Sequence, residues 1–149
     1  MAVYLRNATR GTGVDTAALV AATHTILNAI GEPVSSLSLS LVRDAEIRKL
    51  NATFRGKDAA TDVLSFSLVE GEAPSQRGER MLGDVVISVD TALRQARDYD
   101  ATLDEELRRL LIHGVLHLIG HDHEEAADAK RMRAQERRLA KAIGLAWPY

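Results

Sequence analysis

The sequence predicts one domain of the α/β (α+β) class, with a small mixed sheet of about four strands packed with about five helices. Segments of alternating apolar residues, typical of strands, are interleaved with segments that repeat apolar residues at helical spacing. At 149 residues, with 46% hydrophobic and 27% charged residues, the chain is long enough to bury one core. We therefore expect residues 1–149 to form a single domain of two or three layers.

In the first half of the chain, strands and helices alternate. Asp15 is a candidate N-cap and Gly31 a candidate stop for the first helix, and Asp44 is placed to cap the second helix. The serines and leucines of residues 36–42 alternate with period two, which predicts a strand with one buried face. The predicted elements are a strand at residues 3–5, a helix at 15–30, a strand at 36–42, a helix at 44–53 and a strand at 62–68.

The second half begins with an expected exposed loop, because Pro74 lies between two glycines there. Asp90 is a candidate cap for the next helix, and either Thr102 or Asp104 for the longer helix after it. The predicted elements are a loop at residues 71–78, a strand at 85–89, a helix at 90–99, a helix from 102 or 104 to 120, and an amphipathic helix at 124–143.

The composition narrows the classes of function. No run of about 18 apolar residues could span a bilayer, and the N-terminus lacks the pattern of a signal peptide, so we expect a cytoplasmic protein without a membrane partner. The absence of cysteine excludes disulfides and thiolate-bound metals, so any metal must bind to His, Asp or Glu. A net charge of −2 means that any site for a polyanion must be local.

Two histidines stand out within the long helix of the second half. Residues 110–119 are apolar all round except at His113 and His117, which predicts a buried helix. Residues four apart lie on one helix face, and burying each imidazole without a partner would cost roughly 1–3 kcal/mol. A single buried histidine is more often a hydrogen-bonded core residue. Two histidines on the same helix face favour a shared divalent metal ion.

A third histidine completes the predicted metal site. Gly120 can end the helix and let the chain reverse, which brings His123 toward His113 and His117. Three protein ligands leave a fourth position open, which is typical of a catalytic zinc whose bound water has its pKa lowered to about 7. We expect one Zn²⁺ per chain, although imidazole ligands also suit nickel, copper and iron.

Two neighbours of the third histidine are further candidates for the site. Asp122 could orient a ligand histidine through its other ring nitrogen, or it could be a solvated turn residue. His121 could stack on a ligand or face solvent.

The spacing His-x-x-x-His-x-x-Gly-x-x-His resembles the zinc helix of the metzincin peptidases. Those enzymes carry a glutamate general base directly after the first histidine, where this chain has Gly114. Glycine also costs a helix about 1 kcal/mol relative to alanine, which indicates a steric reason for it. That reason is either room above the metal or close helix packing. A peptidase therefore becomes the least favoured function.

A second group of candidate residues joins the second helix to the next strand. Arg55 could bind a phosphate with two hydrogen bonds and Lys57 could add a point charge, although basic loops are usually only solvated. Nothing in the sequence places this loop near the histidines. The last helix has an excess of two positive charges, which is typical of an ordinary exposed surface and could also contact RNA.

Taken together, these blocks resemble the YbeY family of bacterial endoribonucleases. The resemblance covers about residues 50–138. Its blocks are Asn51 to Asp58, Thr61 to Phe66, Leu82 to Ser88, His113 to His123, and Met132 with Glu136. It implies zinc at His113, His117 and His123 and a functional arginine at Arg55. Ala60 and Ser67 depart from it, because the family commonly has proline at both positions.

The resemblance also implies a single-strand-specific endoribonuclease that matures the 3′ end of small-subunit (16S) rRNA and acts in ribosome quality control. Its partners would be ribosomal RNA, small-subunit precursors and assembly proteins. As a mechanism, we hypothesise that zinc polarises a phosphodiester oxygen or its bound water while Arg55 neutralises transition-state charge. Arg55 and the three histidines are thus the candidate catalytic residues, and Lys57, Asp122 and His121 are candidates to contact substrate or support a ligand. The alternative is a non-catalytic ribosome-assembly factor in which the zinc is structural.

Overall fold

The computed structural model describes residues 2–70 and 79–146, and within these ranges it contains four strands and five helices. The strands are β1 (Val3–Asn7), β2 (Ser36–Val42), β3 (Val63–Ser67) and β4 (Met81–Ser88). The helices are α1 (Thr16–Ala29), α2 (Asp44–Arg55), α3 (Val89–Asp98), α4 (Leu103–Leu118) and α5 (Ala126–Ala142). The predicted fold class is confirmed. The loop predicted at residues 71–78 lies outside the described residues.

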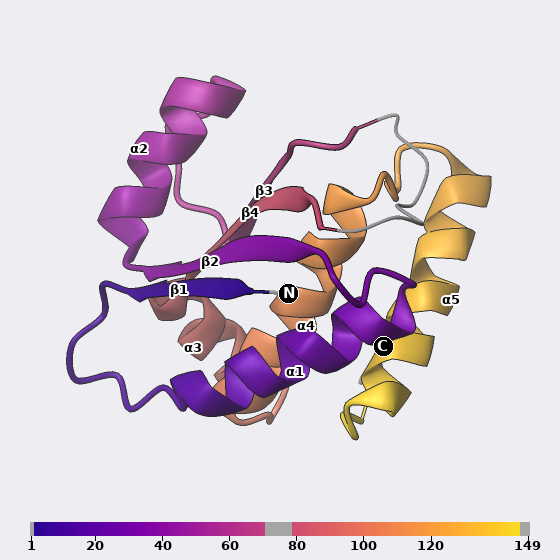
Figure 1. The fold of residues 1–149 in the computed structure, drawn as a ribbon. Helices are drawn as coiled ribbons and strands as arrows, with labels where there is room; N and C mark the ends of the chain where they lie inside the picture. The colour runs from indigo at the N-terminus through magenta and orange to yellow at the C-terminus, as the bar shows by residue number, and fades with distance from the viewer. Residues whose placement is uncertain (1, 71–78, 147–149) are drawn as a thin grey trace.

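The four strands form one mixed sheet in the order β1-β2-β4-β3 (Figure 1). β1, β2 and β4 run parallel, and β3 is an edge strand antiparallel to β4. In β2, Leu37, Leu39 and Leu41 are fully buried while the serines between them are partly exposed, as the period-two pattern predicts.

Helices cover both faces of the sheet, so the domain has three layers. Val85 and Ile87 of β4 pack into the main core, which also takes in α1, α3, α4 and α5. Val86 points to the opposite face, where a smaller apolar cluster includes Ile47 of α2. Figure 1 shows α2 on one side of the sheet and α1 with α4 on the other.

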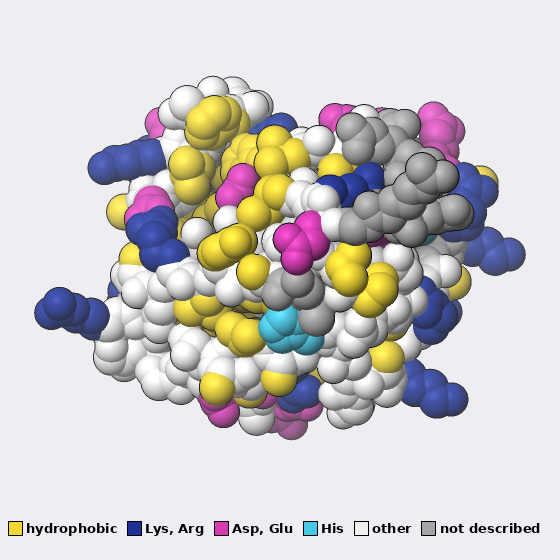
Figure 2. Space-filling view, in the orientation of Figure 1, with side chains coloured by type: hydrophobic (Ala, Val, Ile, Leu, Met, Phe, Trp, Pro, Cys, Tyr) yellow, Lys and Arg dark blue, Asp and Glu magenta, His cyan; other side chains and the backbone are white. Residues whose placement is uncertain are grey.

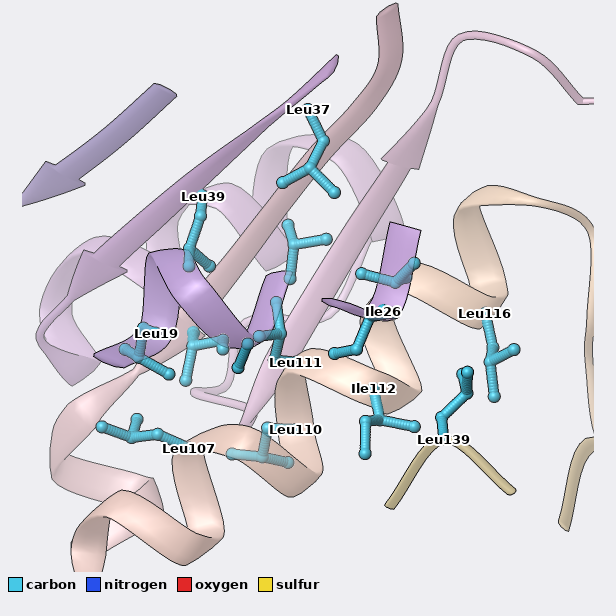
Figure 3. Close-up of a cluster of buried hydrophobic side chains, with 14 of the residues drawn as sticks. Leu19, Ile26, Leu37, Leu39, Leu107, Leu110, Leu111, Ile112, Leu116 and Leu139 are labelled. Atoms are coloured by element: carbon cyan, nitrogen blue, oxygen red, sulfur yellow. The ribbon is translucent and has the colours of Figure 1, made fainter. Parts of the chain in front are cut away.

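Helix α4 is the centre of the main core. It contacts α1, α3, α5 and two strands, and Leu111, Ile112 and Leu116 are fully buried on it (Figure 3). Thr102 is its N-cap and forms a reciprocal capping box with Glu105, so the helix begins after Thr102 rather than after Asp104. No helix in the described residues has the length and apolar character needed to cross a bilayer.

Two predicted helix caps are wrong. Asp44 is the first residue of α2, whose N-cap is Arg43, and α3 is capped by the Ser88 hydroxyl rather than by Asp90. The Asp44 carboxylate instead accepts hydrogen bonds from the hydroxyls of Ser88 (2.6 Å) and Thr91 (2.7 Å). These two aspartates therefore tie α2 to α3, because Asp90 also accepts from the Asp44 N–H (3.0 Å).

The predicted strand at residues 85–89 begins four residues too late, because β4 starts at Met81. Gly83 and Asp84 are poor strand formers, so the pattern there predicts no strand. The glycine is needed for close strand approach, since a Cβ at Gly83 would lie 2.1 Å from the Phe66 carbonyl oxygen. β1 likewise extends two residues beyond its predicted end, to Asn7.

Candidate metal centre

His113 and His117 lie one helical turn apart near the C-terminal end of α4, and their side chains face each other. Their ring centroids are 4.6 Å apart, and the two Nε2 atoms are separated by 3.1 Å. Both residues are only partly buried, whereas Ile112, Val115 and Leu116 on the rest of this segment are fully buried. The predicted pairing of the two imidazoles on one face of a buried helix is thus observed.

His123 reaches the same point because the chain reverses after α4. Gly120 has a φ of +99°, and the His121 N–H donates back to the Leu116 carbonyl (3.0 Å), which closes the last helical turn. The His123 ring then lies 5.8 Å from that of His113 and 5.5 Å from that of His117. One ring nitrogen from each of the three residues lies within 4.8 Å of the others.

The donor set and its spacing fit a divalent metal ion such as zinc. Zinc–nitrogen bonds of 2.0–2.1 Å in a tetrahedral site place two ligand nitrogens about 3.4 Å apart. The 3.1 Å between the Nε2 atoms of His113 and His117 is close to that separation. His123 is exposed and follows the helix, so its ring is less constrained by packing than the two rings on α4.

Burial lowers the pKa of the His117 imidazole below its ordinary value, and the neighbouring His113 and His123 lower it further. The ring is therefore neutral near pH 7, which is the form that binds a metal.

Glu136 of α5 is the one buried carboxylate that faces the histidines within the described residues. It is 8% exposed, and its Oε2 lies 3.4 Å from Nδ1 of His113. A carboxylate there accepts from the Nδ1–H of His113 and leaves Nε2 free for the metal. Sequence reasoning noted Glu136 only among the charges of the last helix and within the family blocks, because nothing in the sequence places α5 against α4.

We expect Glu136→Ala to weaken zinc binding about 10- to 100-fold, the usual effect of removing a carboxylate that orients a ligand histidine. Competition with a chromophoric chelator measures this affinity without relying on catalysis. Glu125→Ala is the matched control, because that carboxylate is exposed and makes no side-chain capping bond. A folded Glu136→Ala protein with unchanged zinc affinity would contradict the prediction.

Gly114 lies where α4 packs closely on the sheet. A Cβ there would lie 2.7 Å from Cγ1 of Val85, 3.2 Å from Oγ of Ser65 and 3.3 Å from Cγ2 of Val63. Between the two reasons considered for the glycine, the contacts favour close packing. A glutamate at this position would point into the sheet.

We expect Gly114→Ala to lower the free energy of unfolding. Overpacking costs about 1–3 kcal/mol, and the gain of about 1 kcal/mol in helix propensity offsets only part of it. Urea unfolding measures the change. Val85→Ala is then combined with Gly114→Ala to remove the contact between the new methyl group and Val85. The double variant should lose less unfolding free energy than the two single variants lose in sum. A Gly114→Ala protein more stable than wild type would show that helix propensity alone matters here.

A cleft of about 820 Å³ joins the histidines to the second group of predicted residues. The three histidines line it together with Arg55 and Lys57. The structure thus brings together the histidines and the basic loop, which the sequence could not place near each other. Asp62, Glu70 and Glu124 also line the cleft, and sequence reasoning assigned no role to them.

Arg55 is held in place although it is exposed. Its Nη2 donates to the Ser65 carbonyl (2.6 Å), and its guanidinium lies 5.0 Å from the centroid of the Phe66 ring. The Phe66 ring in turn packs edge-to-face against Phe54, with their centroids 5.3 Å apart. Arg55 is therefore oriented toward the edge of β3 before any ligand binds.

His121 and Asp122 do not line this cleft. Together with Arg131 and Asp128 they border a smaller cavity of about 260 Å³ beyond the turn at Gly120. The Asp122 carboxylate accepts from the Glu124 N–H (3.3 Å), as a turn residue does. Among the described contacts, it is Glu136 rather than Asp122 that reaches one of the three predicted ligands, His113. A role for either His121 or Asp122 at the metal stays a prediction.

The chain is similar to known proteins over most of its length. A family model described as "Endoribonuclease YbeY" matches residues 5–144. A Myxococcus xanthus protein named endoribonuclease YbeY is 58% identical over 110 residues, which are 73% of this chain and 37% of that protein. A protein of the same name from an Anaeromyxobacter species is 53% identical over 121 residues, or 80% of this chain and 60% of that protein. The chain thus covers less than two thirds of these two relatives.

Another relative and a solved structure are matched over more of their length. The endoribonuclease YbeY of Moorella thermoacetica is 47% identical over 117 residues, and the alignment covers 74% of each chain. The solution structure of TM1509 from Thermotoga maritima superposes with a TM-score of 0.66 at 26% identity, covering 95% of this chain and 89% of that one. From the family match across residues 5–144, supported by these relatives, we conclude that the chain belongs to the YbeY family.

Proposed function

We propose that this protein is a zinc-dependent endoribonuclease that cuts single-stranded RNA. The observation that carries the proposal is the shared cleft, which three convergent histidines line together with Arg55 and Lys57. Its relatives are named endoribonucleases. The substrate we propose is the 3′ end of small-subunit (16S) rRNA in precursor particles, with a role in ribosome quality control in the cytoplasm.

Each group in the cleft has a separate task in this proposal. His113, His117 and His123 would hold the zinc, with Glu136 orienting His113. When bound, zinc supplies Lewis-acid chemistry and lowers the pKa of a coordinated water. Arg55 stabilises the negative charge that grows on the phosphate as the phosphodiester bond breaks, and Lys57 attracts the RNA backbone toward the cleft.

The test is cleavage of a small-subunit rRNA precursor by the purified, zinc-loaded protein, with the cut positions mapped. Specific cleavage near the mature 3′ end supports the proposal. Intact RNA, together with stable binding to precursor particles, would instead support an assembly factor with a structural zinc. Figure 2 shows Lys and Arg side chains projecting along α5, a surface that could serve such binding.

A second measurement separates a catalytic from a structural zinc. A catalytic ion with three protein ligands accepts a further ligand, whereas a closed structural site does not. In the cobalt-substituted protein, an added hydroxamate or thiol should change the visible spectrum if the fourth position is open.

A further inference from the structure

Among the described strands β3 pairs only with β4, and its other edge lies along the cleft that contains the histidines. In an antiparallel pair, the backbone groups of alternate residues point toward the partner strand and away from it. The Ser88 N–H donates to the Asp62 carbonyl, and the Leu68 N–H to the Leu82 carbonyl, both at 2.9 Å. The even-numbered residues of β3 therefore pair with β4, and the odd-numbered residues point their N–H and C=O groups outward.

Side chains already satisfy some of these outward groups. The Ser65 carbonyl accepts from Arg55 (2.6 Å), and the Val63 N–H donates to the Asp62 carboxylate (2.7 Å). Among the residues that the structure describes, none accepts from the Ser65 N–H. At Ser65 the groups that have no partner among the described residues are thus donors, namely its own N–H and the other N–H groups of Arg55.

We infer that the Ser65 N–H and the Arg55 guanidinium together bind one phosphate group of the RNA backbone. This inference rests on the proposed endoribonuclease function. Backbone and guanidinium N–H groups form strong, charge-assisted hydrogen bonds with phosphate oxygens. Lys57 lines the same cleft and adds positive charge to it.

An extended peptide, the usual ligand of a free sheet edge, fits this position poorly. A peptide strand pairs with both the N–H and the C=O of an outward residue. At Ser65 the carbonyl already accepts from Arg55, so a peptide N–H would have to compete with the guanidinium for that oxygen. An anion needs no acceptor from the protein and leaves the Arg55 contact intact.

The subsite has a fixed position relative to the metal centre. The Ser65 hydroxyl donates to the Gly114 carbonyl (3.0 Å), one residue after His113. This contact ties β3 to α4, and the stacking of Arg55 on Phe66 fixes the other donor. The phosphate is therefore held by groups that are in place before RNA binds.

The test compares two proteins that have the same side chain at position 65 and differ only in whether the backbone N–H is present. Ser65→Ala is measured against its ester counterpart, in which the α-hydroxy analogue of alanine at position 65 replaces the N–H by an oxygen. Binding of a fluorescein-labelled single-stranded RNA is measured in metal-free protein at fixed salt. Loss of one charge-assisted hydrogen bond should weaken binding of the ester protein about tenfold. Equal affinity of the two proteins would overturn the inference.

A matched control and a direct readout accompany this comparison. An ester also weakens the carbonyl before it as an acceptor, so Ser67→Ala and its ester counterpart are compared in the same way. The RNA affinities of these two proteins should differ less than twofold, because Arg55 contacts the backbone at Ser65 and not at Ser67. In nuclear magnetic resonance titrations, the Ser65 amide proton should move downfield as RNA is added. An unmoved Ser65 resonance at saturating RNA, or one moved only by an extended peptide, would overturn the inference.

The outcomes separate this inference from the proposed function. If RNA is cleaved but the two proteins altered at position 65 bind RNA equally, the phosphate subsite is wrong and the endoribonuclease proposal stands. If RNA shifts the Ser65 resonance and the ester weakens binding, but no RNA is cleaved, the subsite stands and the catalytic proposal fails.

Discussion

A His117→Ala variant is expected to lose RNA cleavage by at least about a thousandfold. Its Nε2 lies 3.1 Å from that of His113, so the substitution removes one of the two helix-borne imidazoles of the predicted metal site. Zinc provides several kcal/mol of charge stabilisation to hydrolytic transition states, and each 1.36 kcal/mol is a tenfold change in rate. Two remaining imidazoles should hold the ion too weakly to keep it.

Two measurements check this prediction, namely initial rates on the rRNA precursor and the zinc content of protein purified without a histidine tag. His24→Ala is the matched control, because His24 lies on α1 and does not line the cleft. That variant should keep both its zinc and its rate. Undiminished cleavage by zinc-free His117→Ala protein would show that the metal is dispensable, or that a contaminating ribonuclease cuts the RNA.

The grouping of the three histidines could be predicted because it depends on local geometry. Spacing of four residues on a helix places His113 and His117 on one face, and a glycine after the helix is a common stop. Both rules operate over a few residues, which is why the turn at Gly120 brings His123 within reach as expected. The serine–leucine alternation of β2 could be predicted for the same reason.

The rest of the site depends on contacts between distant segments. The sequence could not show that Glu136, 23 residues after His113, returns to its ring, because that depends on how α5 packs against α4. Nor could it place Arg55 in one cleft with the histidines, since α2 and α4 lie on opposite faces of the sheet and both form hydrogen bonds with Ser65 of β3. Residues with the right chemistry were identified, and the strand order that joins them was not.

The wrong helix caps have a similar cause. Asp44 and Asp90 are good N-caps by residue type, yet both carboxylates join α2 to α3. Tertiary hydrogen bonds thus override a local preference, and the Ser88 hydroxyl caps α3 in place of Asp90.

Arg55→Ala is expected to reduce kcat for RNA cleavage about 100- to 1,000-fold, the usual cost of losing one donor to developing negative charge. Its zinc content should stay at the wild-type level, because Arg55 contacts the Ser65 carbonyl and the Phe66 ring rather than the histidines. Arg55→Lys keeps the charge but loses the planar fork, so its rate should fall between those of Arg55→Ala and wild type.

The matched control for Arg55 is Arg48→Ala, on the same helix. Arg48 is exposed, pairs with Asp58 (2.8 Å), and does not line the cleft. Because both side chains are exposed, solvent screens this ion pair, so this variant should fold and cleave RNA normally. We expect Arg55→Ala to lose cleavage rate but keep its zinc, and His117→Ala to lose both. This difference would separate charge stabilisation from metal binding. A fall in zinc content of Arg55→Ala to the level of His117→Ala would instead mean that Arg55 supports the metal centre, because a residue acting only on the phosphate leaves the ion bound.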